Sequence, residues 1–254
     1  MSTTFVRRAA GLGSRLCIFL LAGAAPLTHA MDHADLEGAW QLKSPMTTLT
    51  QSDDKLPFTD DGRKMFEANR AAAAKGDFGF DPTTATCSSP GVPRLQIAPM
   101  LIKLVVRPEL VTFLYEWNGL FRLVDMKSER RQPPPIGTKK KLYGNRAQQD
   151  LLFGTMTGKS YGHWDRNDLL IESDGFSDQK LLDNYLPNSE DLKVLERIRL
   201  VNRNTLEDRI TVTDPQIFKD PWTAVITYTR QQDRAFEEYV CLDRQRAGQQ
   251  IWPH

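Results

Sequence analysis

The sequence predicts a mainly β chain whose antiparallel strands close into an up-and-down barrel or a strongly curved sheet, with one N-terminal helix. Three observations support this fold class: short β-rich runs follow one another with short turns, one segment alone has clear helical patterning, and strands and helices do not alternate. The composition, 40% apolar and 26% charged in 254 residues, is that of a folded domain.

The expected strands are short and come mostly as neighbouring pairs. Arg166-Asn167 is a turn of hairpin length, and Asn202-Arg203-Asn204 separates a second pair. After a first strand that holds Gly38-Ala39-Trp40, the expected strands are residues 102–106, 111–117, 121–125, 160–165, 168–173, 192–201, 205–213, 224–230 and 238–243.

The one long helix expected in the chain covers residues 59–74. Thr59 is suited to cap its start, acidic residues fill its first turn, and Lys75-Gly76 is a typical helix end. The prolines and glycine of residues 90–93 predict a fixed irregular crossing after it.

Residues 1–30 have the features of a Sec-type export signal that is cleaved near Ala30. Three arginines make its start positive, the apolar run 16–27 is too short to span a bilayer, and small residues stand at the −3 and −1 positions. The mature chain, residues 31–254, is then expected to be one periplasmic or secreted domain with no integral membrane span. Its 30 basic and 32 acidic residues give no reason to expect a nucleic-acid partner.

Removal of the signal leaves two cysteines, Cys87 and Cys241. An even pair in an oxidising compartment favours a disulfide that joins the early part of the mature chain to its last strand. Two free buried thiols are the alternative.

Residues 126–150 form a long basic insert without strand or helix patterning. A solvated flexible loop explains it, and so does a lid or a contact with an anionic surface.

Two short motifs suggest enzymes but lack the required context. Residues 154–160 resemble a phosphate loop with one residue too few between the glycines and no helix after them. Residues 158–162 fit G-x-S-x-G, yet a hairpin follows where a nucleophile elbow requires a helix. His33, His163 and His254 have no ligand-spaced partners, so the sequence predicts no metal site and no cofactor.

Strand alternation places two acidic residues among aliphatic ones. One face of residues 192–200 reads Leu, Val, Glu, Ile, Leu, and the same parity puts Asp208 between aliphatic neighbours in the next strand. A turn centred on Arg203 then makes Glu196 and Asp208 diagonal neighbours on one face, with Ile198 opposite Asp208.

Buried carboxyl groups are costly unless they are paired, hydrogen-bonded or solvated. Two interpretations stay open: a structural ion-pair network or another register, and a ligand cavity in which one carboxyl acts as general acid or base. In the second interpretation the catalytic candidates are Glu196, Asp208 and His163, and the ligand-binding candidates are Tyr115, Tyr161, Arg122 and Trp164.

Gly38-Ala39-Trp40 on the first strand resembles the G-x-W signature of lipocalin-like (calycin) barrels. That resemblance implies binding of a small apolar molecule and, occasionally, an enzyme such as a carotenoid hydratase. The chain also resembles an uncharacterised group of exported bacterial proteins in residues 90–94, 160–164, 192–199 and 214–222. Where that group is expected to have Pro-His-Ser, this chain has Pro187-Asn188-Ser189, so no role passes to that position.

Three functional hypotheses follow. The first is an exported barrel that binds a small, largely apolar molecule, with the 126–150 insert at its rim. The second is a cofactor-independent lyase, isomerase or hydratase that uses Glu196 and Asp208. The third is an envelope interaction protein whose basic insert contacts anionic partners. The sequence leaves the ligand and the oligomeric state open.

Overall fold

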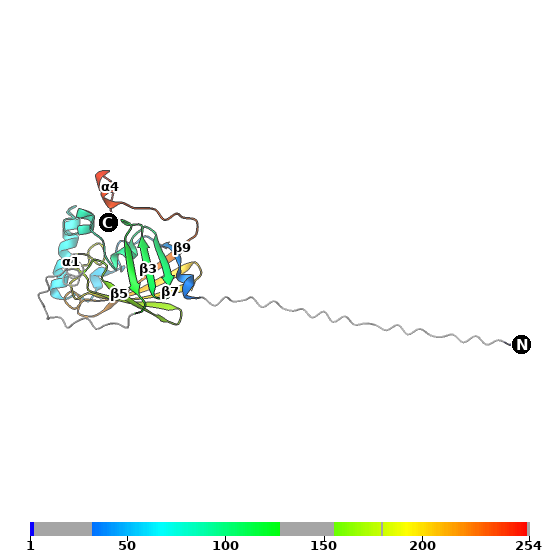
Figure 1. Ribbon diagram of the computed structural model, residues 1–254. Helices are drawn as coiled ribbons and strands as arrows, with labels where there is room; N and C mark the ends of the chain where they lie inside the picture. The colour runs from blue at the N-terminus through cyan, green and yellow to red at the C-terminus, as the bar shows by residue number, and fades with distance from the viewer. Residues whose placement is uncertain (3–31, 128–154, 179, 253–254) are drawn as a thin grey trace. The chain divides into compact units, whose positions relative to one another are not determined.

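Nine strands close into a barrel in sequence order, from β1 to β9. Figure 1 draws the strands as arrows and labels β3, β5, β7 and β9. The computed structural model describes residues 1–2, 32–127, 155–178 and 180–252, and Met31–His254 forms one compact unit. The predicted fold class, a mainly β barrel, is confirmed. The strands are β1 (Gly38–Leu42), β2 (Ile102–Arg107), β3 (Leu110–Tyr115), β4 (Phe121–Asp125), β5 (Lys159–Asp165), β6 (Asp168–Asp174), β7 (Lys193–Asn202), β8 (Thr205–Thr213) and β9 (Trp222–Gln231).

The barrel is antiparallel throughout except between β4 and β5. These two strands run parallel, with Val124 opposite Ser160, so the expectation of a wholly antiparallel meander is wrong at this pair. A parallel pair requires a longer connection than a hairpin turn, and residues 126–158 separate the two strands in the sequence. Residues 128–154 of that connection lie outside the described residues, and so does most of the predicted 126–150 loop.

Gly38 and Trp40 close the seam between β1 and β9. Gly38 has φ +141°, and a Cβ there would lie 2.5 Å from Nη1 of Arg230, so the glycine leaves room for the guanidinium. That guanidinium lies 4.1 Å from the centre of the Trp40 ring and donates to the backbone carbonyls of Asp35 and Glu37. The G-x-W segment therefore holds the first and last strands together.

One long helix and several short ones lie at the two ends of the barrel. At one end η1 packs against β2 and β7, and its Leu36 carbonyl accepts a hydrogen bond of 3.0 Å from Trp40 Nε1. At the other end the chain between β1 and β2 forms a cap, whose last helix, η3, is buried. The helices are η1 (His33–Leu36), η2 (Asp53–Lys55), α1 (Asp60–Ala73), α2 (Pro82–Thr86), η3 (Arg94–Ile97) and α4 (Cys241–Arg246).

Helix α1 confirms the predicted long helix. The Thr59 side chain accepts a hydrogen bond of 3.0 Å from the backbone N–H of Gly62, and Gly76 adopts φ +74° just beyond the helix end. None of the helices within the described ranges has the length and apolar content of a bilayer-spanning segment.

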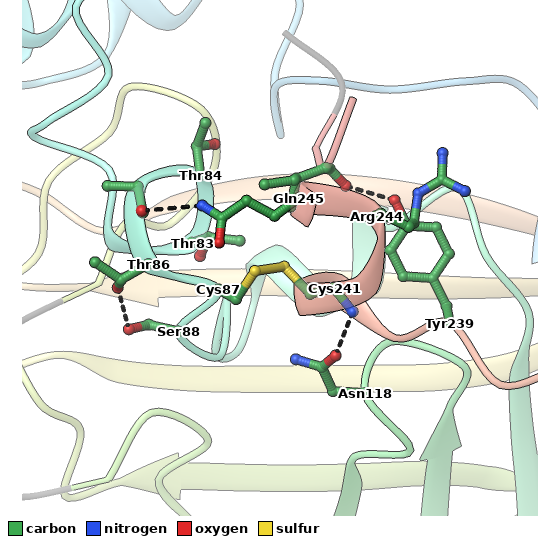
Figure 2. Close-up of a disulfide and its surroundings, with 12 residues drawn as sticks. Thr83, Thr84, Thr86, Cys87, Ser88, Asn118, Tyr239, Cys241, Arg244 and Gln245 are labelled. Atoms are coloured by element: carbon green, nitrogen blue, oxygen red, sulfur yellow. Dashed lines mark hydrogen bonds between the residues drawn. A yellow bond between two sulfur atoms is a disulfide. The ribbon is translucent and has the colours of Figure 1, made fainter. Parts of the chain in front are cut away.

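The predicted Cys87–Cys241 disulfide is present and closes a separation of 154 residues (Figure 2). The expected strand at 238–243 is wrong, because Cys241 is the first residue of α4. β9 already pairs with β1 and closes the barrel, so no free strand edge remains for these β-prone residues. Their backbone instead contacts the turn after β3, where the Asn118 side chain accepts from Cys241 N at 2.8 Å.

Candidate functional site

The interior of the barrel is the site that the sequence indicated. Alternate residues of each strand face it, and most are aliphatic or aromatic, as a packed barrel core requires. Against this background a few buried polar side chains stand out. They are Gln96, Tyr115, Arg122, Ser160, Ser173, Glu196, Asp208 and Tyr228.

Glu196 is paired with Arg122 inside the barrel. Its Oε1 lies 3.0 Å from Nη1 of the arginine, its Oε2 is paired with Nη2, and both side chains are almost wholly buried. Arg122 also donates to the hydroxyls of Ser160 and Ser173, each at 2.8 Å. This fork of charge-assisted hydrogen bonds satisfies both ions inside an apolar core.

Gln96 of η3 enters the barrel and completes this polar network. Its Nε2 donates to Glu196 Oε1 at 2.8 Å, while its Oε1 accepts from the Tyr115 hydroxyl at 3.1 Å. The Tyr228 hydroxyl donates to the backbone carbonyl of Gln96 at 2.7 Å. Burial raises the pKa of both tyrosines, so each stays a hydrogen-bond donor.

Asp208 differs from Glu196 in its environment. The register is the predicted one: Ile198 is opposite Asp208 and Glu196 is opposite Ile210. Asp208 is 2% exposed, and no donor among the described residues reaches its Oδ1. Burial, and then the negative charge of Glu196, raise the pKa of Asp208 well above that of a free aspartate. Asp208 is therefore a buried carboxyl group whose neutral form is favoured by its surroundings, and it lies beside the Arg122–Glu196 ion pair.

A cavity of about 10 Å³ lies beside Asp208. This volume accommodates about one water molecule, so the barrel is largely filled by its own side chains. The lining is apolar apart from one carboxyl, one amide and one phenol. It consists of Trp40, Gln96, Ile102, Leu104, Phe113, Ile198, Leu206, Asp208 and Tyr228.

The structure brings together four of the predicted site residues: Glu196, Asp208, Tyr115 and Arg122. It does not place the others inside. His163 and Tyr161 lie on the outer face of β5, because the inward parity of this strand belongs to Ser160 and Gly162. The expectation that these two side chains face the interior is therefore wrong.

Trp164 lies at the end of the barrel instead of inside the cavity. Its ring stacks on His33 of η1 at a centroid distance of 3.8 Å, and the His33 ring nitrogen lies 2.6 Å from the Arg166 carbonyl. These contacts tie η1 to the β5–β6 turn.

Sequence reasoning missed four residues of the network. Ser160, Ser173 and Tyr228 follow from the same strand parity that identified Glu196, so that signal was available. Gln96 had no such signal, because it lies in the short helix η3, where the alternation of a strand gives no side-chain direction.

A second buried polar cluster lies where the cap meets the β6–β7 connection and the C-terminal segment. Both terminal nitrogens of Arg94 pair with the Asp81 carboxylate, at 2.6 and 2.8 Å, and Nη2 reaches Asn184 at 3.2 Å. The Trp252 indole donates to the same Asn184 oxygen at 3.0 Å. This cluster joins the cap to the end of the chain.

Within the part of the chain that the structure describes, no three His, Cys, Asp or Glu side chains are grouped to hold a metal ion. No protein-family model and no curated protein sequence matches the chain. The chain is thus a closed, mainly β barrel that holds a polar network at its centre and a buried carboxyl group at the edge of a small apolar cavity.

Proposed function

We propose that the mature chain, residues 31–254, is an exported barrel protein that binds one small, largely apolar molecule beside Asp208. The observation that carries the proposal is the orphaned Oδ1 of Asp208 at the edge of an otherwise apolar cavity. A buried carboxyl group without a partner gains a hydrogen bond when a ligand brings an acceptor or donor to it. The disulfide supports export to an oxidising compartment.

The ligand has an apolar body and one polar group. Six of the nine lining residues present only apolar surface to the cavity. Trp40 is one of these six, because its indole N–H already donates to the Leu36 carbonyl. Because the cavity accommodates about one water molecule, any larger ligand displaces wall side chains as it enters. The calycin resemblance of Gly38-Ala39-Trp40 favours the same kind of ligand.

Native mass spectrometry of the protein purified from its own host tests this proposal. We expect a bound small molecule that organic solvent extracts from the wild type. Leu206→Phe places a larger side chain in the cavity, and we expect this variant to be purified without the bound molecule. Val225→Phe changes the exposed outer face of β9, and we expect this variant to keep the bound molecule. Absence of a bound molecule, or equal amounts in the two variants, contradicts the proposal.

A second candidate function is a cofactor-independent lyase, isomerase or hydratase in the same cavity. The observation that favours it is the raised pKa of Asp208, since a neutral carboxylic acid can donate a proton to a substrate. Glu196 is a weaker candidate for proton transfer because both of its carboxyl oxygens already accept hydrogen bonds from Arg122. Asp208→Asn should abolish turnover of the extracted compound while leaving its binding in place; unchanged turnover contradicts this candidate.

A further inference from the structure

The C-terminal part of the chain builds a second hollow, outside the barrel. After β9, residues 232–240 run alongside the turn that connects β3 to β4. The backbone N–H of Glu237 donates to Glu116 Oε1 at 2.8 Å, and Tyr239 N donates to the Glu116 carbonyl at 3.0 Å. The disulfide then fixes α4, from which Arg244 lies beside Tyr239 (Figure 2). Between these segments and Pro99 lies a cleft of about 350 Å³.

The size and walls of this cleft suit a small organic molecule. Its volume falls in the range of small-ligand sites, about 300–1,000 Å³, and it far exceeds the cavity inside the barrel. Pro99, Met100 and Ile251 give it an apolar side, and Tyr239 an aromatic one. An apolar chain of a few carbons therefore finds a complementary surface there.

The charges of the cleft favour a cation. Glu116 is 3% exposed and lines it as a fixed carboxylate, each oxygen accepting one backbone N–H at 2.8 Å, from Leu101 and Glu237. Each oxygen retains a further lone pair. Glu237 and Glu238 add two more carboxylates to the lining.

The two arginines of the cleft do not offset this preference. Arg244 already interacts with other residues that line the cleft. Its guanidinium lies 4.6 Å from the centre of the Tyr239 ring, and its nitrogens donate to the Gln250 carbonyl. Arg234 lies 3.9 Å from Glu116 and is 42% exposed, which is a loose, solvent-screened ion pair. A stronger or better-placed cation can replace it.

We propose that this cleft is a second binding site, and that its ligand is a small organic ammonium ion whose amine takes the place of Arg234 beside Glu116. The apolar part of the ligand lies along Met100 and Ile251. This site is independent of the barrel cavity and of the ligand proposed there.

Isothermal titration of the mature protein with n-butylammonium tests the site, with butyrate as a size-matched anion. We expect one saturable site for the ammonium and none for butyrate. Arg234→Ala removes the competing cation and should tighten ammonium binding about two- to fivefold, whereas Glu238→Gln should weaken it by a similar factor. Glu67→Gln, an exposed charge change on α1, is the matched control and should leave binding unchanged.

Two results overturn the proposal. If butyrate binds and Arg234→Ala weakens that binding, the cleft is an anion site. If neither the wild type nor Arg234→Ala binds n-butylammonium, the cleft does not recognise organic cations.

Discussion

Arg122 on β4 and Glu196 on β7 meet inside the barrel as a two-point ion pair, although the β5–β6 hairpin separates their strands. Removal of one partner leaves an uncompensated buried charge, which costs about 3–5 kcal/mol. We therefore expect Glu196→Gln to lower the free energy of unfolding by about that amount in urea titrations.

The double variant Arg122→Met/Glu196→Leu is the control for this pair. Apolar side chains of similar volume remove both charges, so we expect the double variant to be more stable than Glu196→Gln. A double variant that is as unstable as the sum of both single variants would show that Arg122 and Glu196 stabilise the barrel separately.

Asp53 of the cap and Asp183, which lies between β6 and β7, form a pH-sensitive carboxyl pair. Burial, and then the charge of Asp183, raise the pKa of Asp53 to about 7, while Asp183 accepts backbone N–H bonds from Leu49, Tyr185 and Leu186. A raised pKa means that the folded state binds the proton more tightly than the unfolded chain. The contribution of Asp53 is thus fully present below about pH 4 and is lost as the pH rises toward 7.

Asp53→Asn removes this titration and tests it directly. We expect the unfolding free energy of the variant to increase relative to that of the wild type as the pH rises from 4 to 8. At pH 8 the relative increase should be about 1–3 kcal/mol. Asp54→Asn, at an exposed neighbouring position, should keep the wild-type pH profile. A constant difference between Asp53→Asn and wild type across this range would show that Asp53 does not titrate in it.

The disulfide contributes to stability through the length of the loop that it closes. For a separation of 154 residues, the chain-entropy model gives about 4–5 kcal/mol. We expect Cys87→Ser/Cys241→Ser to lose about this amount in denaturant unfolding, and a reductant to destabilise the wild type equally. A loss below about 1 kcal/mol would mean that the non-covalent contacts of Trp252 and Tyr239 suffice to hold the C-terminal segment.

Gly62 allows α1 to approach the loop after β8. A Cβ at this position would lie 2.2 Å from the Ile217 backbone carbonyl, which cannot move as a side chain can. Gly62→Ala should destabilise the protein by about 1–3 kcal/mol or more, because the helix must shift away. Gly76→Ala, where φ is +74° and the space is open, is the comparison and should cost about 1 kcal/mol in thermal unfolding. Equal effects would indicate that the contact of α1 with Ile217 relaxes freely.

Strand parity accounts for what the sequence predicted inside the barrel. It correctly predicted that the side chains of Glu196 and Asp208 point into the barrel, because side-chain direction alternates along any strand. With the turn centred on Arg203, it also predicted that Ile198 pairs with Asp208. The same alternation places Arg197 on the outer face of β7, where it pairs with Asp165 and Asp168 of the β5–β6 hairpin.

The partners of those carboxyl groups were beyond local patterns. Arg122 reaches Glu196 only because the barrel closes and β4 pairs parallel with β5, a pairing that depends on a long connection. Gln96 comes from the short helix η3 of the cap. The prediction of a strand at residues 238–243 was wrong because β propensity is a local property of the sequence. It carries no information on whether a strand edge is free, and β1 already pairs with the edge of β9.

The entry of Gln96 into the barrel constrains how this sequence can diverge. Gln96 of the cap donates to the Glu196 carboxyl group of β7 and accepts from the Tyr115 hydroxyl of β3. The buried polar groups of the barrel therefore depend on a residue of the cap for their hydrogen bonds. Replacement of Gln96 alone leaves Glu196 and Tyr115 with unmet bonds at the centre of the protein. In descendants of this chain we therefore expect positions 96, 115, 122 and 196 to change together or not at all, and a cap exchanged between relatives to be tolerated only when it brings a matching residue at position 96.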